Sequence, residues 1–130
     1  MSSFVELAPV VRIRVRNVLL REGYPSEGSV EAVMDTGYGG FLAVPEPVFD
    51  ALSLGKLMTE SRSVELADGR RVRSKVAYGT VDLVGMDREV DGPVETIEGL
   101  TEVLLGTRLL SHFRVTLDYC LRAVSFDPCR

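Results

Sequence analysis

The sequence predicts an all-β fold with one or two short helices. Several short segments alternate apolar and polar side chains, which is typical of half-buried strands. Asp68-Gly69 is a strong signal for a two-residue hairpin turn, because this pair tolerates positive φ. With 130 residues, the chain can bury one core but not two, so we expect a single domain over residues 1–130.

The expected strands run through the whole chain. Pro9–Arg16 and Ser29–Met34 are predicted to pair antiparallel across the loop from Gly23 to Gly28. The apolar run at residues 41–44, closed by Pro45, is typical of a fully buried strand. The remaining expected strands are residues 64–67, 70–73, 78–84, 93–97, 102–105, 114–119 and 121–126, with a water-facing polar loop at 87–92.

Two short helices are expected between these strands. Residues 47–52 begin with proline, place three apolar side chains on one face and are followed by Gly55 as a stop. Thr107 can cap a second helix, on which His112 falls. The apolar residues expected on its buried side are Leu109, Leu110 and Phe113.

Composition excludes several classes of function. The net charge of −4 argues against a nucleic-acid partner, and the arginines at 12, 14 and 16 are interpreted as a solvated sheet face. The sequence has no apolar stretch of membrane-helix length and no signal-peptide layout at its start, so a cytoplasmic protein without membrane contact is expected. One histidine and two cysteines argue against a zinc site, and we expect no metal or other cofactor. Cys120 and Cys129 are either free thiols or a hairpin disulfide.

The chain is organised around a glycine-rich turn that follows Asp35. The apolar run Val30–Met34 stops at this carboxylate and resumes at Phe41. A carboxylate at the end of a core strand is costly to bury unless it is hydrogen-bonded or used. The turn can be a structural Asx-type turn, a phosphate-binding loop or an aspartic protease loop. The phosphate interpretation is weak because the turn lacks a third glycine at the required spacing and leads into a strand.

Two separated motifs support the protease interpretation. Residues 33–42, with the sequence VMDTGYGGFL, resemble the active-site strand of retroviral-type (retropepsin-like) aspartic proteases. Residues 103–110, VLLGTRLL, look like the hydrophobic–glycine–helix segment that packs behind the catalytic loop in that family, and residues 113–119 are similar to the strand that follows. The sequence departs from the family at Tyr38-Gly39-Gly40, where small or hydroxyl residues are usual. The resemblance implies a closed acid-protease β-barrel.

The resemblance also implies roles for particular residues. Such enzymes use two carboxylates, and this chain has one Asp-Thr-Gly, so an active enzyme would be a homodimer with Asp35 supplied by each subunit. Thr36 would brace the two loops across the interface, and Gly37 would donate an amide to its own carboxylate. Leu105 and Gly106 would support the loop from behind.

The expected substrate is a peptide or protein held between the turn and a hairpin. The hairpin at Asp68-Gly69 has a low apolar content, so it is either a flap or a plain edge hairpin. The flap is favoured because the resemblance implies a flap at this position after the active-site strand. Residues expected to contact substrate are Tyr38, Gly39, Ala67, Asp68 and Gly69. Asp118 is the nearest rival carboxylate but lacks a following glycine, and His112 belongs to no catalytic triad pattern.

Two other functions remain open from the sequence. A dimer of this fold can grip an extended peptide without cutting it, as a peptide-binding module. A structural β-domain in a larger assembly is a third interpretation, and it predicts no cleft.

Overall fold

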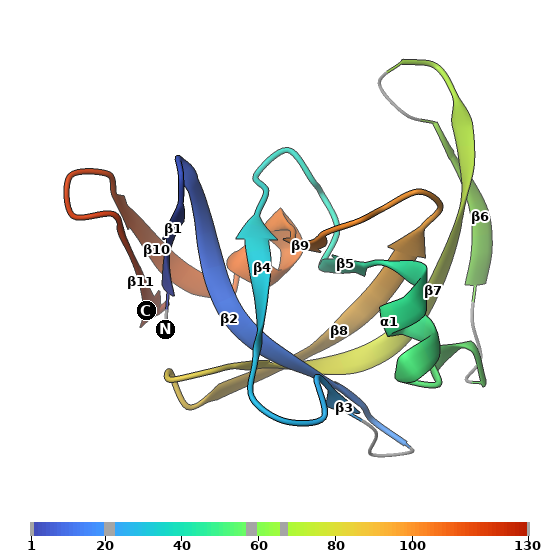
Figure 1. Ribbon diagram of the computed structural model, residues 1–130, viewed down its shortest axis with the longest axis horizontal. Coiled ribbons are helices and arrows are strands. Elements are labelled where there is room, and N and C mark those ends of the chain that lie inside the picture. The colour runs from blue at the N-terminus through green and yellow to red at the C-terminus, as the bar shows by residue number, and fades with distance from the viewer. Residues whose placement is uncertain (1, 20–22, 57–59, 66–67, 130) are drawn as a thin grey trace.

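The computed structural model describes residues 2–19, 23–56, 60–65 and 68–129. Its helices are α1 (Glu46–Ala51), the 3-10 turn η1 (Leu54–Lys56) and α2 (Thr107–Leu110). Its strands are β1 (Ser2–Val5), β2 (Ala8–Asn17), β3 (Gly23–Tyr24), β4 (Val30–Met34), β5 (Leu42–Val44), β6 (Glu60–Glu65), β7 (Arg71–Leu83), β8 (Arg88–Ile97), β9 (Val103–Leu105), β10 (Phe113–Asp118) and β11 (Ala123–Pro128). The predicted all-β fold with short helices is confirmed (Figure 1).

A closed barrel forms the body of the molecule. Its strands pair in the cyclic order β2, β4, β9, β5, β8, β7 and back to β2. The pairs β4–β9 and β5–β8 are parallel, and the others in the ring are antiparallel. Val11, Ile13 and Val15 of β2 are fully buried and alternate with the arginines at 12, 14 and 16. Apolar side chains therefore fill the barrel while the charged ones point away from its core.

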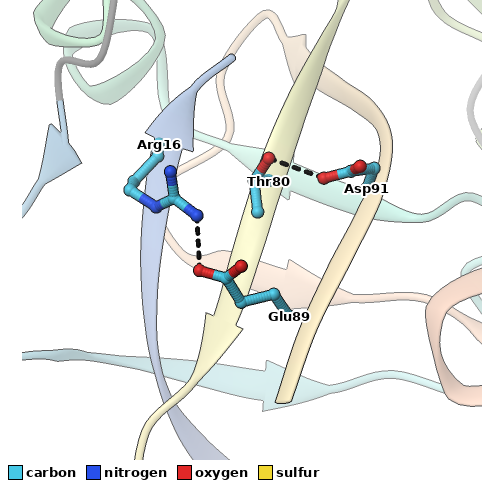
Figure 2. Close-up of polar contacts among 4 residues, drawn as sticks. All are labelled: Arg16, Thr80, Glu89 and Asp91. Carbon is cyan, nitrogen blue, oxygen red and sulfur yellow. Dashed lines mark hydrogen bonds and ion pairs between the residues drawn. The ribbon is translucent and has the colours of Figure 1, made fainter. Parts of the chain in front are cut away.

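Polar side chains bridge the seam at which β2 meets β7. Arg16 of β2 pairs in register with Thr80 of β7, and its guanidinium forms an ion pair with Glu89 of β8. The Thr80 hydroxyl donates to Asp91 Oδ1 at 2.6 Å. Figure 2 shows both contacts, which link β8 to β7 and to β2 where the barrel closes.

The strand β7 differs from the prediction of two separate strands at 70–73 and 78–84. It is continuous because it pairs along its length with β6, β8 and β2, and these ladders override the expected break between residues 73 and 78. A Cβ on Gly79 would lie 2.9 Å from a Val94 methyl group and 3.2 Å from the Arg16 carbonyl oxygen. Gly79 thus allows a close approach of strands in mid-sheet and does not mark a strand end.

The polar segment at 87–92 is also mostly strand. β8 begins at Arg88, so the expected loop is only a tight turn around Gly85 and Asp87, both of which have positive φ. The ladder from Leu83↔Arg88 to Gly79↔Gly92 accounts for this, because backbone pairing does not require apolar side chains. The predicted first hairpin is present, with β2 and β4 antiparallel from Val10↔Val33 to Ile13↔Val30.

The second helix is shorter than predicted. α2 is a single turn whose N-cap is Gly106, without a side-chain cap hydrogen bond, so Thr107 does not cap it. His112 follows the helix and is exposed, and Phe113 is buried as the first residue of β10. The Thr107 hydroxyl instead contacts the Tyr38 carbonyl oxygen at 3.4 Å, which draws it away from the cap position.

The two cysteines lie at opposite ends of one hairpin. β10 and β11 pair from Phe113↔Pro128 to Asp118↔Ala123, with Cys120 in the turn and Cys129 beyond the open end. Both are exposed and free. Strands of this length separate the thiols by roughly 17 Å, more than twice the Cα–Cα span of a disulfide. The hairpin disulfide is therefore excluded, and the free-thiol alternative holds.

Candidate active site

The Asp35 loop joins the end of β4 to β5. The Asp35 amide donates to the Leu105 carbonyl oxygen of β9 at 2.9 Å, which fixes the start of the loop. The Gly37 amide donates to Asp35 Oδ1 at 2.9 Å, and the Tyr38 amide donates to the Asp35 carbonyl oxygen at 3.1 Å. Asp35 is half-buried, whereas Thr36 and Gly37 are exposed. One carboxylate oxygen is thus oriented by the loop itself, as in an Asx-type turn.

The segment after β9 supports this loop from behind. Gly106 and Arg108 donate their amides to Phe41 and Gly40 carbonyl oxygens at 3.0 and 3.1 Å, and the Thr107 amide donates to the Tyr38 carbonyl oxygen at 2.9 Å. A Cβ on Gly106 would lie only 2.0 Å from the Gly40 carbonyl oxygen. The segment can approach so closely only because residue 106 is glycine.

Tyr38 turns its side chain back onto the fold. Its ring lies against Gly40 and Gly106, since a Cβ on either glycine would lie within 3 Å of Tyr38 side-chain atoms. Its hydroxyl donates to Glu95 Oε1, and Ser74 Oγ donates to Glu95 Oε2 at 2.7 Å. Gly40 therefore leaves the space that the Tyr38 side chain fills, which explains why tyrosine and glycine occur together in this loop.

Sequence reasoning did not single out Glu95, Ser74 or Arg108. The sequence does contain a hint of Glu95, because a carboxylate stands inside the predicted strand 93–97. Glu95 is 9% exposed and Ser74 is 1% exposed, so both are buried. Nothing in the sequence indicated that Tyr38 would reach them, because the contact joins residues 57 positions apart.

The hairpin β6–β7 has a longer turn than the two residues predicted. Its last ladder pair is Glu65↔Arg71, so Arg70, which was predicted to begin the second strand, lies outside the ladder. Gly69 has a φ of +86° and Asp68 is exposed. The Arg70 amide and then its guanidinium hydrogen-bond to the Asp68 carboxylate, which lowers the pKa of Asp68. Ala67 lies outside the described residues.

An apolar groove runs beside the turn end of this hairpin. It has a volume of about 430 Å³ and lies between β7, the β8–β9 loop and β9. Its lining residues are Arg70, Val72, Ile97, Glu98, Gly99, Leu100 and Leu104. Leu104 precedes Leu105 in β9, and the Leu105 carbonyl oxygen accepts from the Asp35 amide. The groove therefore lies beside the strand that holds Asp35. Figure 1 shows the hairpin and the β4–β5 loop rising from the same end of the barrel.

A second apolar groove, of about 350 Å³, opens beside Thr36. It is lined by Met34, Thr36, Thr107, Leu110, Ser111, Phe113, Val115 and Leu117. Asp118, the rival carboxylate, lies at the end of β10, where its Oδ1 accepts from the Leu121 amide at 2.9 Å. This bond caps the hairpin turn, which is a structural role.

No family model matches the chain. A protein of the archaeon Archaeoglobus fulgidus, described only as uncharacterized, is 39% identical over 126 residues, which cover 97% of this chain and 98% of the relative. The chain belongs to the family of this archaeal protein. Among solved structures, EIAV protease complexed with the inhibitor HBY-793 matches with a TM-score of 0.57 and 13% identity, covering 85% of this chain and 92% of that protein. This chain thus shares the fold of that retroviral protease.

Two features are absent from the described residues. They contain no group of three or more His, Cys, Asp or Glu side chains placed to hold a metal ion. None of the helices in the described part of the chain has the length and apolar character needed to span a membrane.

Proposed function

We propose that the chain is an aspartic endopeptidase that works as a homodimer, with Asp35 contributed by each subunit. The observation that carries this proposal is the Asp35 loop, in which the Gly37 amide orients the carboxylate within a retroviral protease fold. A purely structural Asx turn needs the same hydrogen bond. It does not need the close support from Gly106 or a half-buried carboxylate at the end of a core strand.

In the proposed mechanism, the two Asp35 carboxylates share one proton. The ionised carboxylate takes a proton from a water molecule, whose oxygen attacks the peptide carbonyl carbon, while the protonated one donates to the carbonyl oxygen. The tetrahedral intermediate then collapses as the C–N bond breaks. The carboxyl group that took the proton from water gives it to the leaving amine, and the other carboxylate takes a proton from a hydroxyl of the intermediate, so that the pair again holds one proton. The Gly37 amide keeps the Asp35 carboxylate of the same subunit oriented throughout, and Thr36 braces the loop of one subunit against that of the other.

The apolar groove beside Thr36 supports the dimer. Thr36 is exposed at its rim, and Leu110, Val115 and Leu117 give it an apolar floor next to the loop that must meet its copy. A twofold axis past Thr36 would cover this groove with the same surface of a second chain and bring the two Asp35 side chains together.

The proposed substrate is an extended peptide between the hairpin and the loop. Within the described part of the chain β6 pairs with β7 alone, so its other edge can pair with a peptide. Asp68 and Gly69 stand at the hairpin tip and Gly39 is exposed on the loop, so these residues are proposed to contact substrate together with Tyr38 and Ala67.

The decisive test is Asp35→Asn, which removes the ionisable group at nearly constant shape. We expect peptide cleavage at acidic pH to disappear while the fold survives. The matched control is Asp87→Asn, an exposed turn residue with positive φ that asparagine tolerates. Cleavage by Asp35→Asn with the wild-type pH profile would place the chemistry elsewhere.

The alternative is a dimeric peptide-binding module, which the open edge of β6 also favours. The same experiment separates the two functions. A module would bind peptides in both the wild-type and Asp35→Asn forms and would cleave none.

A further inference from the structure

Glu95 brings a carboxylate into the wall of the barrel behind the Asp35 loop. It lies on β8, in register with Ala43 of β5 and Val76 of β7, and is 9% exposed. A carboxylate at such a position is costly unless hydrogen bonds compensate for the lost water. Replacement of Glu95 by an apolar residue would relieve this cost, so its presence calls for an explanation other than packing.

The two oxygens of Glu95 contact two different parts of the proposed site. Oε1 accepts from the Tyr38 hydroxyl, and Tyr38 belongs to the Asp35 loop. Oε2 accepts from Ser74 Oγ, and Ser74 lies on β7 where this strand pairs with Arg62 of β6. A single carboxylate therefore connects the loop to the strand of the hairpin.

Tyr38 is rigidly coupled to the rest of its loop. Its amide donates to the Asp35 carbonyl oxygen, its own carbonyl accepts from the Thr107 amide, and its ring lies on Gly40 and Gly106. The backbone of Gly40 and of Gly106 already touches the Tyr38 ring, so the Tyr38 side chain cannot move without moving this backbone. A displacement of the Tyr38 hydroxyl must therefore shift the backbone that positions Asp35.

We propose that Glu95 is a positioning residue that couples the Asp35 loop to the hairpin β6–β7 through Tyr38 and Ser74. Its meaning for catalysis rests on the proposed peptidase function. The coupling itself does not, because it is a property of the folded chain. A peptide that moves the hairpin would change the position of Ser74, and Glu95 would pass this change to the loop that holds Asp35.

Amide hydrogen exchange measured by NMR tests the coupling without any activity. Tyr38→Phe deletes one hydroxyl and keeps the ring on Gly40, and we expect exchange in the β6–β7 ladder to rise on the order of tenfold. Ser74→Ala should raise exchange at the Asp35 and Tyr38 amides in the same way. Glu95→Gln should keep amide exchange rates close to those of the wild type, because the glutamine amide can accept from one hydroxyl and donate to the other.

The matched control is Thr80→Val, which deletes another hydroxyl–carboxylate contact between β7 and β8 (Figure 2). It should leave exchange in the loop and in the hairpin unchanged. If Tyr38→Phe and Ser74→Ala each affect only their own immediate neighbours, or if Thr80→Val acts equally on the loop, the coupling does not exist.

A kinetic readout separates this proposal from the proposed function. In an active wild-type enzyme, Tyr38→Phe should lower kcat more than it raises KM, and Glu95→Gln should remain close to wild type in both. If the wild-type protein cleaves no peptide, the peptidase function fails and the exchange measurements alone decide on the coupling. Normal kcat in Tyr38→Phe, together with altered exchange, would show that the coupling through Glu95 does not position Asp35 for catalysis.

Discussion

At the scale of single residues, contacts to glycines decide the shape of the site. Gly106 allows a backbone approach that no side chain permits, and Gly40 makes room for the Tyr38 ring. The resemblance to known loops singled out Asp35, Gly37 and Gly106 as candidate site residues. It could not show the tyrosine contact, because an aromatic ring beside glycines is equally compatible with exposure to substrate.

Gly106→Ala tests the importance of this close approach. The new Cβ would meet the Gly40 carbonyl oxygen, so the loop must move, and we expect a loss of about 1–3 kcal/mol in the free energy of unfolding. Urea unfolding measures this change. Gly55→Ala is the matched control, because a Cβ at that position meets nothing within 4 Å and should leave stability nearly unchanged. Equal stability of the two variants would contradict the packing argument.

At the scale of elements, local pattern predicted strands well and their ends poorly. The first hairpin and the buried strand β5 follow directly from apolar alternation and from Pro45. β7 does not, because its continuity comes from partners far away in the sequence, which no local window contains. The helix α2 shows the same limit, since Thr107 contacts Tyr38 from a distant segment.

The hairpin β6–β7 should be the part of the described chain that responds most to ligand. The β6 side chains at 60, 61, 63 and 65 are exposed and β6 has a free edge, so amide exchange should be fast in the free protein. Exchange should slow when a peptide transition-state mimic binds. Protection of this hairpin without ligand, unchanged by the mimic, would identify a plain edge hairpin.

Acid should loosen the tip of this hairpin. The pKa of Asp68 is lowered by the Arg70 amide and guanidinium, so its stabilising effect is present at neutral pH and is lost as pH falls through that lowered pKa. NMR shifts of the Gly69 and Arg70 amides should report this transition. Asp68→Ala should remove it, and an unchanged titration in that variant would assign the shifts to another group.

At the scale of the whole molecule, the predicted closed barrel is present, and one chain carries one Asp-Thr-Gly. Length and strand pattern were sufficient for the fold class, and the family resemblance supplied the closure. A homodimer interface could not be predicted in detail, because it depends on which side chains from distant segments come together on the surface of the folded chain.

Assembly of the proposed dimer should weaken as pH rises. Two carboxylates in contact cannot easily both ionise, so the dimer retains a proton that separated subunits release, and linkage favours the dimer at lower pH. Sedimentation over a pH series measures this dependence. Asp35→Asn should flatten it, and a monomer at every pH and concentration, also with peptide bound, would exclude the proposed enzyme.

The hairpin β10–β11 has a consequence for covalent chemistry. Because Cys120 and Cys129 lie at opposite ends of this hairpin, the folded chain cannot close a disulfide on itself. Any protein disulfide that forms under oxidising conditions must therefore cross-link two molecules. Non-reducing electrophoresis of folded, oxidised protein should then show linked chains in place of a more compact monomer.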